Sequence, residues 1–258
     1  SEVYTWAYTT VPNNGGTLTQ ATIKAVNTFM TSIKAESGLR SKITRLNLFA
    51  GQGLKSAQVP LIADDSGSDI DTINNFTDSD LDEGLQGGGG SYIDTGVNSA
   101  NASSITSQDN HVMVNIKGEL STQAQAIAIS NYDGSSKAHL SLSVTNGLAK
   151  FLHDFNQTDN KQGAAKKINP DSGTFIGSKI GSTSNLYSNG VSVATGDDGA
   201  NRDVGSGNFQ IFAANNVASF PGRITAYSIG LGLTSSQATA FHNALKALDI
   251  TLRRGAYK

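Results

Sequence analysis

Apolar and polar residues alternate in short runs along most of this chain, with turn residues between them. In the stretch 109–116, Val112, Val114 and Ile116 fall on one face, and the stretch 208–212 alternates in the same way. This period of two predicts strands with one buried face. Further strands are predicted at 43–49, 91–96, 124–130, 140–144, 148–152, 174–176, 185–187, 191–194 and 223–230. Regularly spaced short strands favour a two-sheet antiparallel sandwich over a parallel α/β fold.

Two stretches have the period of a helix instead. Thr17, followed three residues later by Gln20, predicts a helix start, and Gly38 predicts its end in a left-handed cap. Thr234 and Gln237 predict a capping box before a second helix near the C-terminal end. The expected buried stripes are Ile23, Val26, Met30 and Ile33 in the first helix, and Ala238, Phe241, Leu245 and Leu248 in the second. We expect the second helix to cover a sheet.

Two Asn-Gly pairs predict β-hairpins. Asn146-Gly147 and Asn189-Gly190 each lie between alternating runs. Such turns need positive φ at both central residues, which asparagine and glycine tolerate. The 28 glycines of the chain suit many tight turns of this kind.

The first residues of the chain include three aromatic side chains. The run 2–11 holds Tyr4, Trp6 and Tyr8 among Thr and Ala and predicts an exposed or edge strand. Trp6, the single Trp of the chain, either covers an edge of the core or belongs to an assembly arm that docks on a neighbouring subunit. We therefore divide the chain into an N-terminal arm and helix (1–40) and a β-sandwich (41–258), and expect a homo-oligomer.

Composition excludes several classes of protein. The net charge is −2 and no basic run occurs, so nucleic-acid binding has no electrostatic basis. The chain has no Cys, which excludes disulfides and thiolate metal sites. We see no signal peptide and no apolar run of the roughly 18 residues that would span a bilayer, so membrane insertion is not expected. Ser1 is compatible with a native start after Met removal or with a processed end.

Two ordered series of residues resemble a known family. The first is Arg45–Gly51, Val59-Pro60-Leu61, Gly84–Gly87 and Ser91–Gly96; the second is Ser184–Gly190 with Ala226–Gly230 and the Leu233-Thr234 helix start. Together with the preceding helix they are similar to the concanavalin A-like (laminin-G-like) jelly-roll modules of tailed-bacteriophage virion proteins. The resemblance covers roughly residues 18 to 250.

The resemblance implies an all-β, two-sheet jelly-roll sandwich with an N-terminal helix and a short C-terminal helix. It also implies a non-enzymatic structural role on the virion surface, as a capsid decoration or a tail or fibre component. Other virion proteins, and host-surface polysaccharide, are the partners that follow from it. Many relatives are thought to contact host glycans, but the family supplies no fixed set of functional residues.

A glycan site calls for exposed aromatic rings beside Asn, Asp and Gln, because a sugar has an apolar face ringed by hydroxyls. Loop residues with this composition are Tyr132, Asp133, Tyr187, Asn189, Asp197 and Asn201. Hairpin tips have a similar composition without any ligand, so both interpretations stay open.

The acidic stretch 78–84 allows a Ca²⁺ site, since hard cations bind several carboxylate oxygens. Asp78, Asp80 and Asp82 are the candidate ligands, but the stretch departs from the EF-hand pattern and equally suits a solvated loop. No other cofactor is expected.

The alternative to a binding protein is a glycan-degrading enzyme on the same scaffold. Related sandwich glycosidases use paired Glu residues on one strand, and the chain lacks that E-x-D-x-x-E pattern. Its four His residues are scattered and have no metal-ligand spacing.

Overall fold

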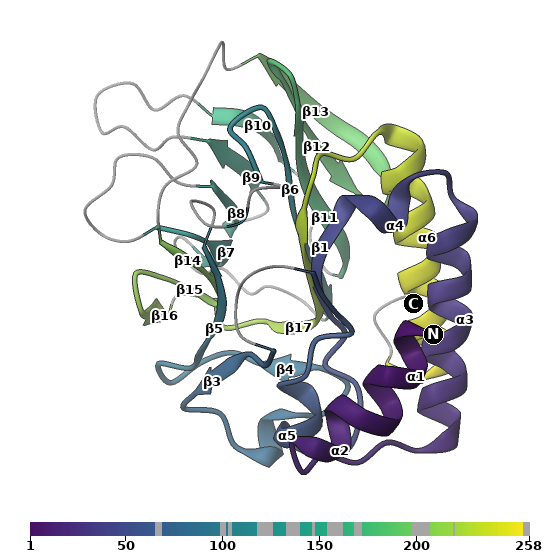
Figure 1. Cartoon of the computed structure of the whole chain (residues 1–258). Coiled ribbons are helices and arrows are strands. Elements are labelled where there is room, and N and C mark those ends of the chain that lie inside the picture. The colour runs from purple at the N-terminus through teal and green to yellow at the C-terminus, as the bar shows by residue number, and fades with distance from the viewer. Residues whose placement is uncertain are drawn as a thin grey trace.

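The two-sheet sandwich is present in the computed structural model of the chain. The structure describes residues 1–64, 69–98, 102, 105–117, 126–132, 140–145, 148–153, 162–167, 172–197, 207–218 and 220–254. Two antiparallel sheets face one another, and helices cover the outer side of one of them (Figure 1). The predicted all-β sandwich with a helix near each end is therefore confirmed.

The first sheet is the one that the helices cover. Its strand order is β13 (Val191–Asp197), β12 (Thr183–Ser188), β11 (Gly173–Ile180), β6 (Asp109–Lys117), β17 (Arg223–Gly230), β1 (Ile43–Asn47) and β2 (Ile62–Ala63), with β4 (Leu85–Gln86) paired to β17. The predicted hairpin of β12 and β13 is confirmed, since Asn189 and Gly190 have φ values of 52° and 77°.

The second sheet closes the sandwich. Its strand order is β10 (Gln162–Lys167), β9 (Leu148–His153), β8 (Leu140–Thr145), β7 (Ala126–Ser130), β14 (Asn208–Ile211), β5 (Tyr92–Asn98) and β3 (Thr72–Asn74). The predicted pairing of β8 with β9 is confirmed, although the Asn146-Gly147 turn lies outside the described residues. A small hairpin, β15 (Ala213–Ala214) and β16 (Val217–Ala218), follows β14.

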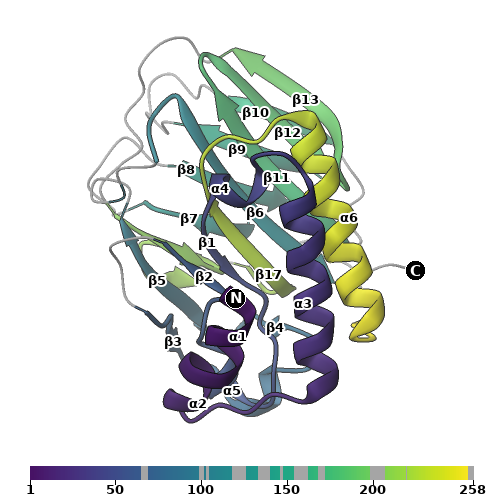
Figure 2. The same cartoon turned by 45° about the vertical axis from the view of Figure 1, so that its right-hand side comes forward.

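The long helices lie on the first sheet. The two long ones are α3 (Gln20–Ala35) and α6 (Ser235–Thr251), which lie side by side in both views (Figures 1 and 2). The short ones are α1 (Glu2–Thr5), the π-helical η1 (Trp6–Thr10), α2 (Val11–Asn13), α4 (Leu39–Lys42), α5 (Leu54–Ala57) and the 3₁₀ turn η2 (Asp78–Asp80). None of the helices in the described ranges is long and apolar enough to cross a membrane.

The first sheet separates two hydrophobic clusters. In β6, Val112 and Val114 face the second sheet, whereas Met113 faces the helices. All three are fully buried, so this central strand is covered on both faces. On the helix side, the rings of Phe29 in α3 and Phe241 in α6 have centroids 6.4 Å apart.

Helix ends follow the predicted capping chemistry with one correction. The capping box of Thr234 and Gln237 forms with both of its hydrogen bonds, and Gly38 adopts φ of 71° after the first helix. The first helix, however, is capped by Thr19, whose side chain accepts a hydrogen bond from the Thr22 amide, rather than by Thr17.

The strand predicted for residues 2–11 is wrong, because this segment is helical. Val3, Trp6, Ala7 and Val11 are buried together against the rest of the chain. Their spacing of three and four residues is that of one helix face, and packing of this face outweighs the strand preference of Thr, Tyr and Val. Trp6 lies in the core of its own chain, and its indole Nε1 donates to the Val59 carbonyl at 3.1 Å.

Candidate functional site

The outer face of the second sheet is the surface that the fold leaves for a ligand. Helices α3 and α6 pack on the outer face of the first sheet against Met113, Ile176 and Ala226. In the part of the chain that the structure describes, no helix covers the corresponding face of the second sheet (Figure 1). Any broad binding surface on a sheet must therefore lie on the second one.

Strand register sorts the second sheet into an apolar inner row and a polar outer row. The inner row consists of Ile73, Ile93, Ile211 and Ile129, and the outer row of Thr72, Asp94, Gln210 and Ser130. Residues that pair directly across neighbouring strands point to the same face, so each row lies on one side of the sheet. The apolar row faces the sandwich core. In the polar row on the other side, Thr72 is exposed and Asp94 partly exposed, whereas Gln210 and Ser130 are buried.

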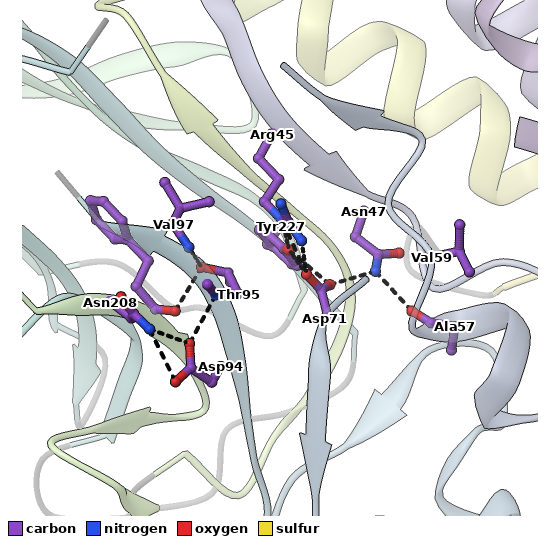
Figure 3. A network of polar contacts seen from close by, with 12 residues as sticks. Arg45, Asn47, Ala57, Val59, Asp71, Asp94, Thr95, Val97, Asn208 and Tyr227 are labelled. Atoms are coloured by element: carbon purple, nitrogen blue, oxygen red, sulfur yellow. Dashed lines mark hydrogen bonds and ion pairs between the residues drawn. The ribbon is translucent and has the colours of Figure 1, made fainter. Parts of the chain in front are cut away.

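Asp94 lies on the outer face in β5, the strand next to the β3 edge of the sheet. Its Oδ1 accepts from the Gly96 amide at 2.8 Å and from Asn208 Nδ2 at 3.1 Å, across a bulge between β5 and β14 (Figure 3). Tyr92, two residues earlier, is on the same face and partly exposed, and pairs in register with Asn74. The partly exposed Tyr92 thus shares one face of the sheet with Asp94 and Asn74.

The β15–β16 hairpin borders this face. Its tip, Asn215-Asn216, has positive φ at both residues and folds back toward β14. Gln210 holds the tip, since its Nε2 donates to Asn216 Oδ1 at 2.6 Å and its Oε1 accepts from the Asn216 amide at 2.8 Å. The Asn215 amide donates to the Tyr132 carbonyl at 3.1 Å, which places the half-buried Tyr132 at the same border.

The loop residues predicted for glycan contact do not come together. Tyr132 lies beside the second sheet as described. Tyr187 is buried under α6 with its hydroxyl 3.3 Å from Ser235 Oγ, so its ring offers no face to a ligand in this structure. Asn189 is part of a turn, where its Oδ1 accepts from the Thr174 amide at 3.0 Å. Asp133, Asn201 and the side chain of Asp197 lie outside the described residues.

Tyr92, Asp94 and Asn208 were not among the predicted site residues. The alternation of Tyr92-Ile93-Asp94-Thr95 already places the ring and the carboxylate on one face of a strand. No pattern in the sequence indicates that β5 pairs with β14, and this pairing brings in Asn208.

The predicted Ca²⁺ ligands serve separate structural tasks. Asp78 Oδ1 accepts from the Leu54 amide at 2.8 Å, and Asp80 Oδ2 accepts from the Thr77 amide at 2.7 Å. The Asp82 carbonyl accepts from the Arg223 guanidinium. Among the described residues, no three His, Asp or Glu side chains are arranged to hold a metal ion.

A buried ionic network joins β1 and β17 of the first sheet to the loop before β3. Arg45 Nη2 donates to Asp71 Oδ1 at 2.8 Å, Tyr227 donates to the same carboxylate at 2.8 Å, and Asn47 Nδ2 donates to Asp71 Oδ2 at 2.7 Å (Figure 3). Burial raises the pKa of Asp71, and the Arg45 charge opposes this. All four side chains are enclosed, so the network fastens the loop before β3 rather than receiving a ligand.

A hollow of about 710 Å³ opens at the edge of the first sheet between α1, α3 and β1. Its charged groups pair with one another: Glu2 lies 2.6 Å from Lys34 and 2.5 Å from Arg40, and Arg40 lies 2.6 Å from Asp64. These ion pairs hold the N-terminal helix in place and leave little unpaired charge for a ligand.

Comparison with solved structures places the chain among β-sandwich proteins. Domain 4 of AbnA, an extracellular GH43 arabinanase from Geobacillus stearothermophilus, solved with arabinotriose, is 15% identical with a TM-score of 0.56, covering 78% of this chain and 98% of that domain. Trypanosoma rangeli sialidase, solved with sialic acid, is 12% identical with a TM-score of 0.55, covering 79% of this chain and 33% of the sialidase. At such identities the similarity establishes the fold alone.

A scan against protein-family models and a search of curated proteins found no match. The resemblance to jelly-roll sandwich modules is confirmed in its structural part. These two solved structures are not phage proteins, and the phage context stays a prediction from the sequence.

Proposed function

We propose that the chain is a non-catalytic glycan-binding protein that uses the outer face of its second sheet. The observation that carries this proposal is the partly exposed Tyr92, which is in register with Asn74 and lies on the same strand face as Asp94 of the Asp94–Asn208 pair. The ring suits the apolar face of a sugar, and the carboxylate and amides suit its hydroxyls. The solved arabinanase domain with arabinotriose supports the choice of ligand, because it shares the sandwich fold.

Asp94 is positioned in advance for this task. Its hydrogen bonds to Gly96 and Asn208 fix the carboxylate, so little side-chain entropy is lost when a ligand binds to it. One carboxylate oxygen still has acceptor capacity toward a sugar hydroxyl. Neutral oligosaccharides are therefore the expected ligands of this face.

The hydrolase alternative would require a second carboxylate. Glycosidases place two carboxyl groups about 5–10 Å apart. The seven strands of the second sheet contain one carboxylate, Asp94. This composition favours binding over hydrolysis on the strands themselves.

The test is binding of arabinotriose and of cellotriose to the purified chain by titration calorimetry. Tyr92→Ala and Asp94→Asn should each weaken binding by about tenfold or more, since loss of one aromatic contact or charged hydrogen bond corresponds to roughly 1–2 kcal/mol. Tyr92→Phe should retain most of the affinity, and Val191→Ala, at an exposed position of the first sheet, is the matched control. Unchanged binding in Tyr92→Ala and Asp94→Asn would refute the site, and released reducing sugar would favour the hydrolase.

The finer proposal is that this binding face is displayed on the surface of a tailed-phage particle, either on the capsid or on the tail. It rests on the ordered series of sequence motifs. Co-sedimentation of the purified chain with phage capsids and with tails tests it. Failure to sediment with either would count against the virion role and would leave the glycan site untouched.

A further inference from the structure

The N-terminal helical segment presents a pair of exposed tyrosine rings. Tyr4 and Tyr8 are 63% and 49% exposed, and within the described ranges they are the aromatic residues with the highest exposure. Their ring centroids lie 4.9 Å apart with an interplanar angle of 40°. The two rings are separated by four residues on one helix face and form a continuous aromatic surface.

The base under this pair is rigid. Trp6 is buried and hydrogen-bonded to the Val59 carbonyl, and Glu2 is tied to Lys34 and Arg40 by ion pairs. The opposite face of the same segment, Val3, Ala7 and Val11, is also buried. The backbone that carries the two rings is therefore fixed before any ligand arrives, which lowers the entropy lost on binding.

Hydroxyl groups flank both rings, and no charge lies between them. Thr5 and Thr9 follow Tyr4 and Tyr8 in the sequence and are exposed. The tyrosine hydroxyls add further donors and acceptors. Apolar ring faces edged by neutral hydroxyls match an uncharged sugar, which has an apolar C–H face and a rim of hydroxyls.

The size of the pair argues against a protein partner. At these exposures the two side chains present roughly 250 Å² of surface, whereas a stable protein interface buries about 800 Å² on each partner. Four other exposed large apolar residues cannot enlarge the surface, because they lie on different elements: Ile180, Val191, Val217 and Ile250. Figure 2 shows α1 and α6 on opposite sides of α3.

We propose that Tyr4 and Tyr8 form a second carbohydrate-contact platform, which takes one or two rings of a neutral oligosaccharide. It lies on the helical side of the molecule, away from the second sheet. The proposal shares its ligand class with the proposed function but does not need the sheet site to exist. Two weak contacts on one chain would raise the avidity for a long glycan that reaches both.

The experiment follows the tyrosine ring signals by NMR while cellotriose, arabinotriose or maltotriose is added to the full chain. Saturable shifts of the Tyr4 and Tyr8 signals are expected both in the wild-type chain and in Tyr92→Ala. Tyr4→Ala should weaken the response of Tyr8 by about tenfold, whereas Tyr4→Phe should keep it within about threefold. Ile250→Ala is the control for loss of an exposed apolar side chain.

Three results would overturn this platform. The first is the absence of saturable shifts with all three trisaccharides. The second is a response that disappears in Tyr92→Ala, which would assign the shifts to the sheet site. The third is a shift on dilution without sugar, which would make the pair a contact between copies of the chain. If only the sheet site is wrong, Tyr92→Ala will bind the sugars with unchanged affinity while Tyr4 and Tyr8 still respond. This outcome distinguishes failure of the proposed function from failure of the platform.

Discussion

Replacing Asp249 with Asn should make the protein more stable at neutral pH. Asp249 lies near the end of α6 and packs against the first sheet, where its Oδ2 accepts from Asn115 Nδ2 at 2.6 Å. Its Oδ1 has no hydrogen-bond partner and lies 3.8 Å from Arg254 Nη1. Burial raises the pKa of Asp249 to about 6, against the opposing Arg254 charge and Asn115 hydrogen bond.

The sign and the size of this stability change follow from the difference between the pKa of Asp249 in the folded and in the unfolded chain. The folded carboxyl retains its proton up to about pH 6, whereas the unfolded one loses it near pH 4. Stability from this group is therefore present below pH 4 and is lost as the pH rises to 6. At about 1.4 kcal/mol per pKa unit, the loss amounts to about 3 kcal/mol. Asn at this position can still accept from Asn115 and carries no such penalty.

Urea unfolding of both proteins, followed by Trp6 fluorescence from pH 4 to pH 8, measures the effect. The stability difference between Asp249→Asn and the wild-type chain should grow by about 3 kcal/mol from pH 4 to pH 7 in favour of the variant. Asp69→Asn, at an exposed position, controls for the loss of a negative charge. If the stability difference between the variant and the wild-type chain does not change with pH, the raised pKa assigned to Asp249 is refuted.

The Asp249→Asn variant should also reveal how His111 affects stability, because the pH dependence from His111 has the opposite sign to that from Asp249. This side chain is enclosed between Leu231 O (2.6 Å) and Ser228 Oγ (2.9 Å), and burial lowers its pKa to about 4. A lowered pKa of the folded state gives stability above pH 6.5 that is lost as the pH falls to 4, again by about 3 kcal/mol. In the wild-type chain the two effects nearly cancel between pH 4 and 6, so acid should destabilise Asp249→Asn more than the wild type.

Three further changes test the packing that supports the fold. Asp71→Ala should destabilise the chain by about 3–5 kcal/mol in urea unfolding, because it removes the buried acceptor that Arg45, Asn47 and Tyr227 share; a loss below about 1 kcal/mol would contradict this. Gly87→Ala should lower stability by about 2 kcal/mol, since the added Cβ would collide with the Phe220 carbonyl, and an unchanged urea midpoint would contradict this clash. Thr234→Ala should remove about 1 kcal/mol through loss of the cap of α6, and unaltered thermal unfolding would exclude a role for that cap.

The sequence by itself determined most of the sandwich. Alternation predicted the central strands β6 and β17, Asn-Gly predicted the β12–β13 hairpin, and Thr234 with Gln237 predicted the start of α6. These features depend on neighbours within a few residues, where side-chain period and φ preferences act directly. The N-terminal segment was the exception, because Tyr, Trp and Thr suggested a strand where the burial of Val3, Trp6 and Val11 requires a helix.

The tertiary structure alone decided which residues meet. Asp94 and Asn208 are far apart in the chain and become neighbours through the pairing of β5 with β14. Tyr187, an attractive loop aromatic in the sequence, is buried because α6 returns across its strand. The charge states of Asp249 and His111 likewise follow from burial by distant elements, which no local pattern encodes. Local periodicity fixes the elements, whereas long-range packing sets the exposure and electrostatics on which a binding site depends.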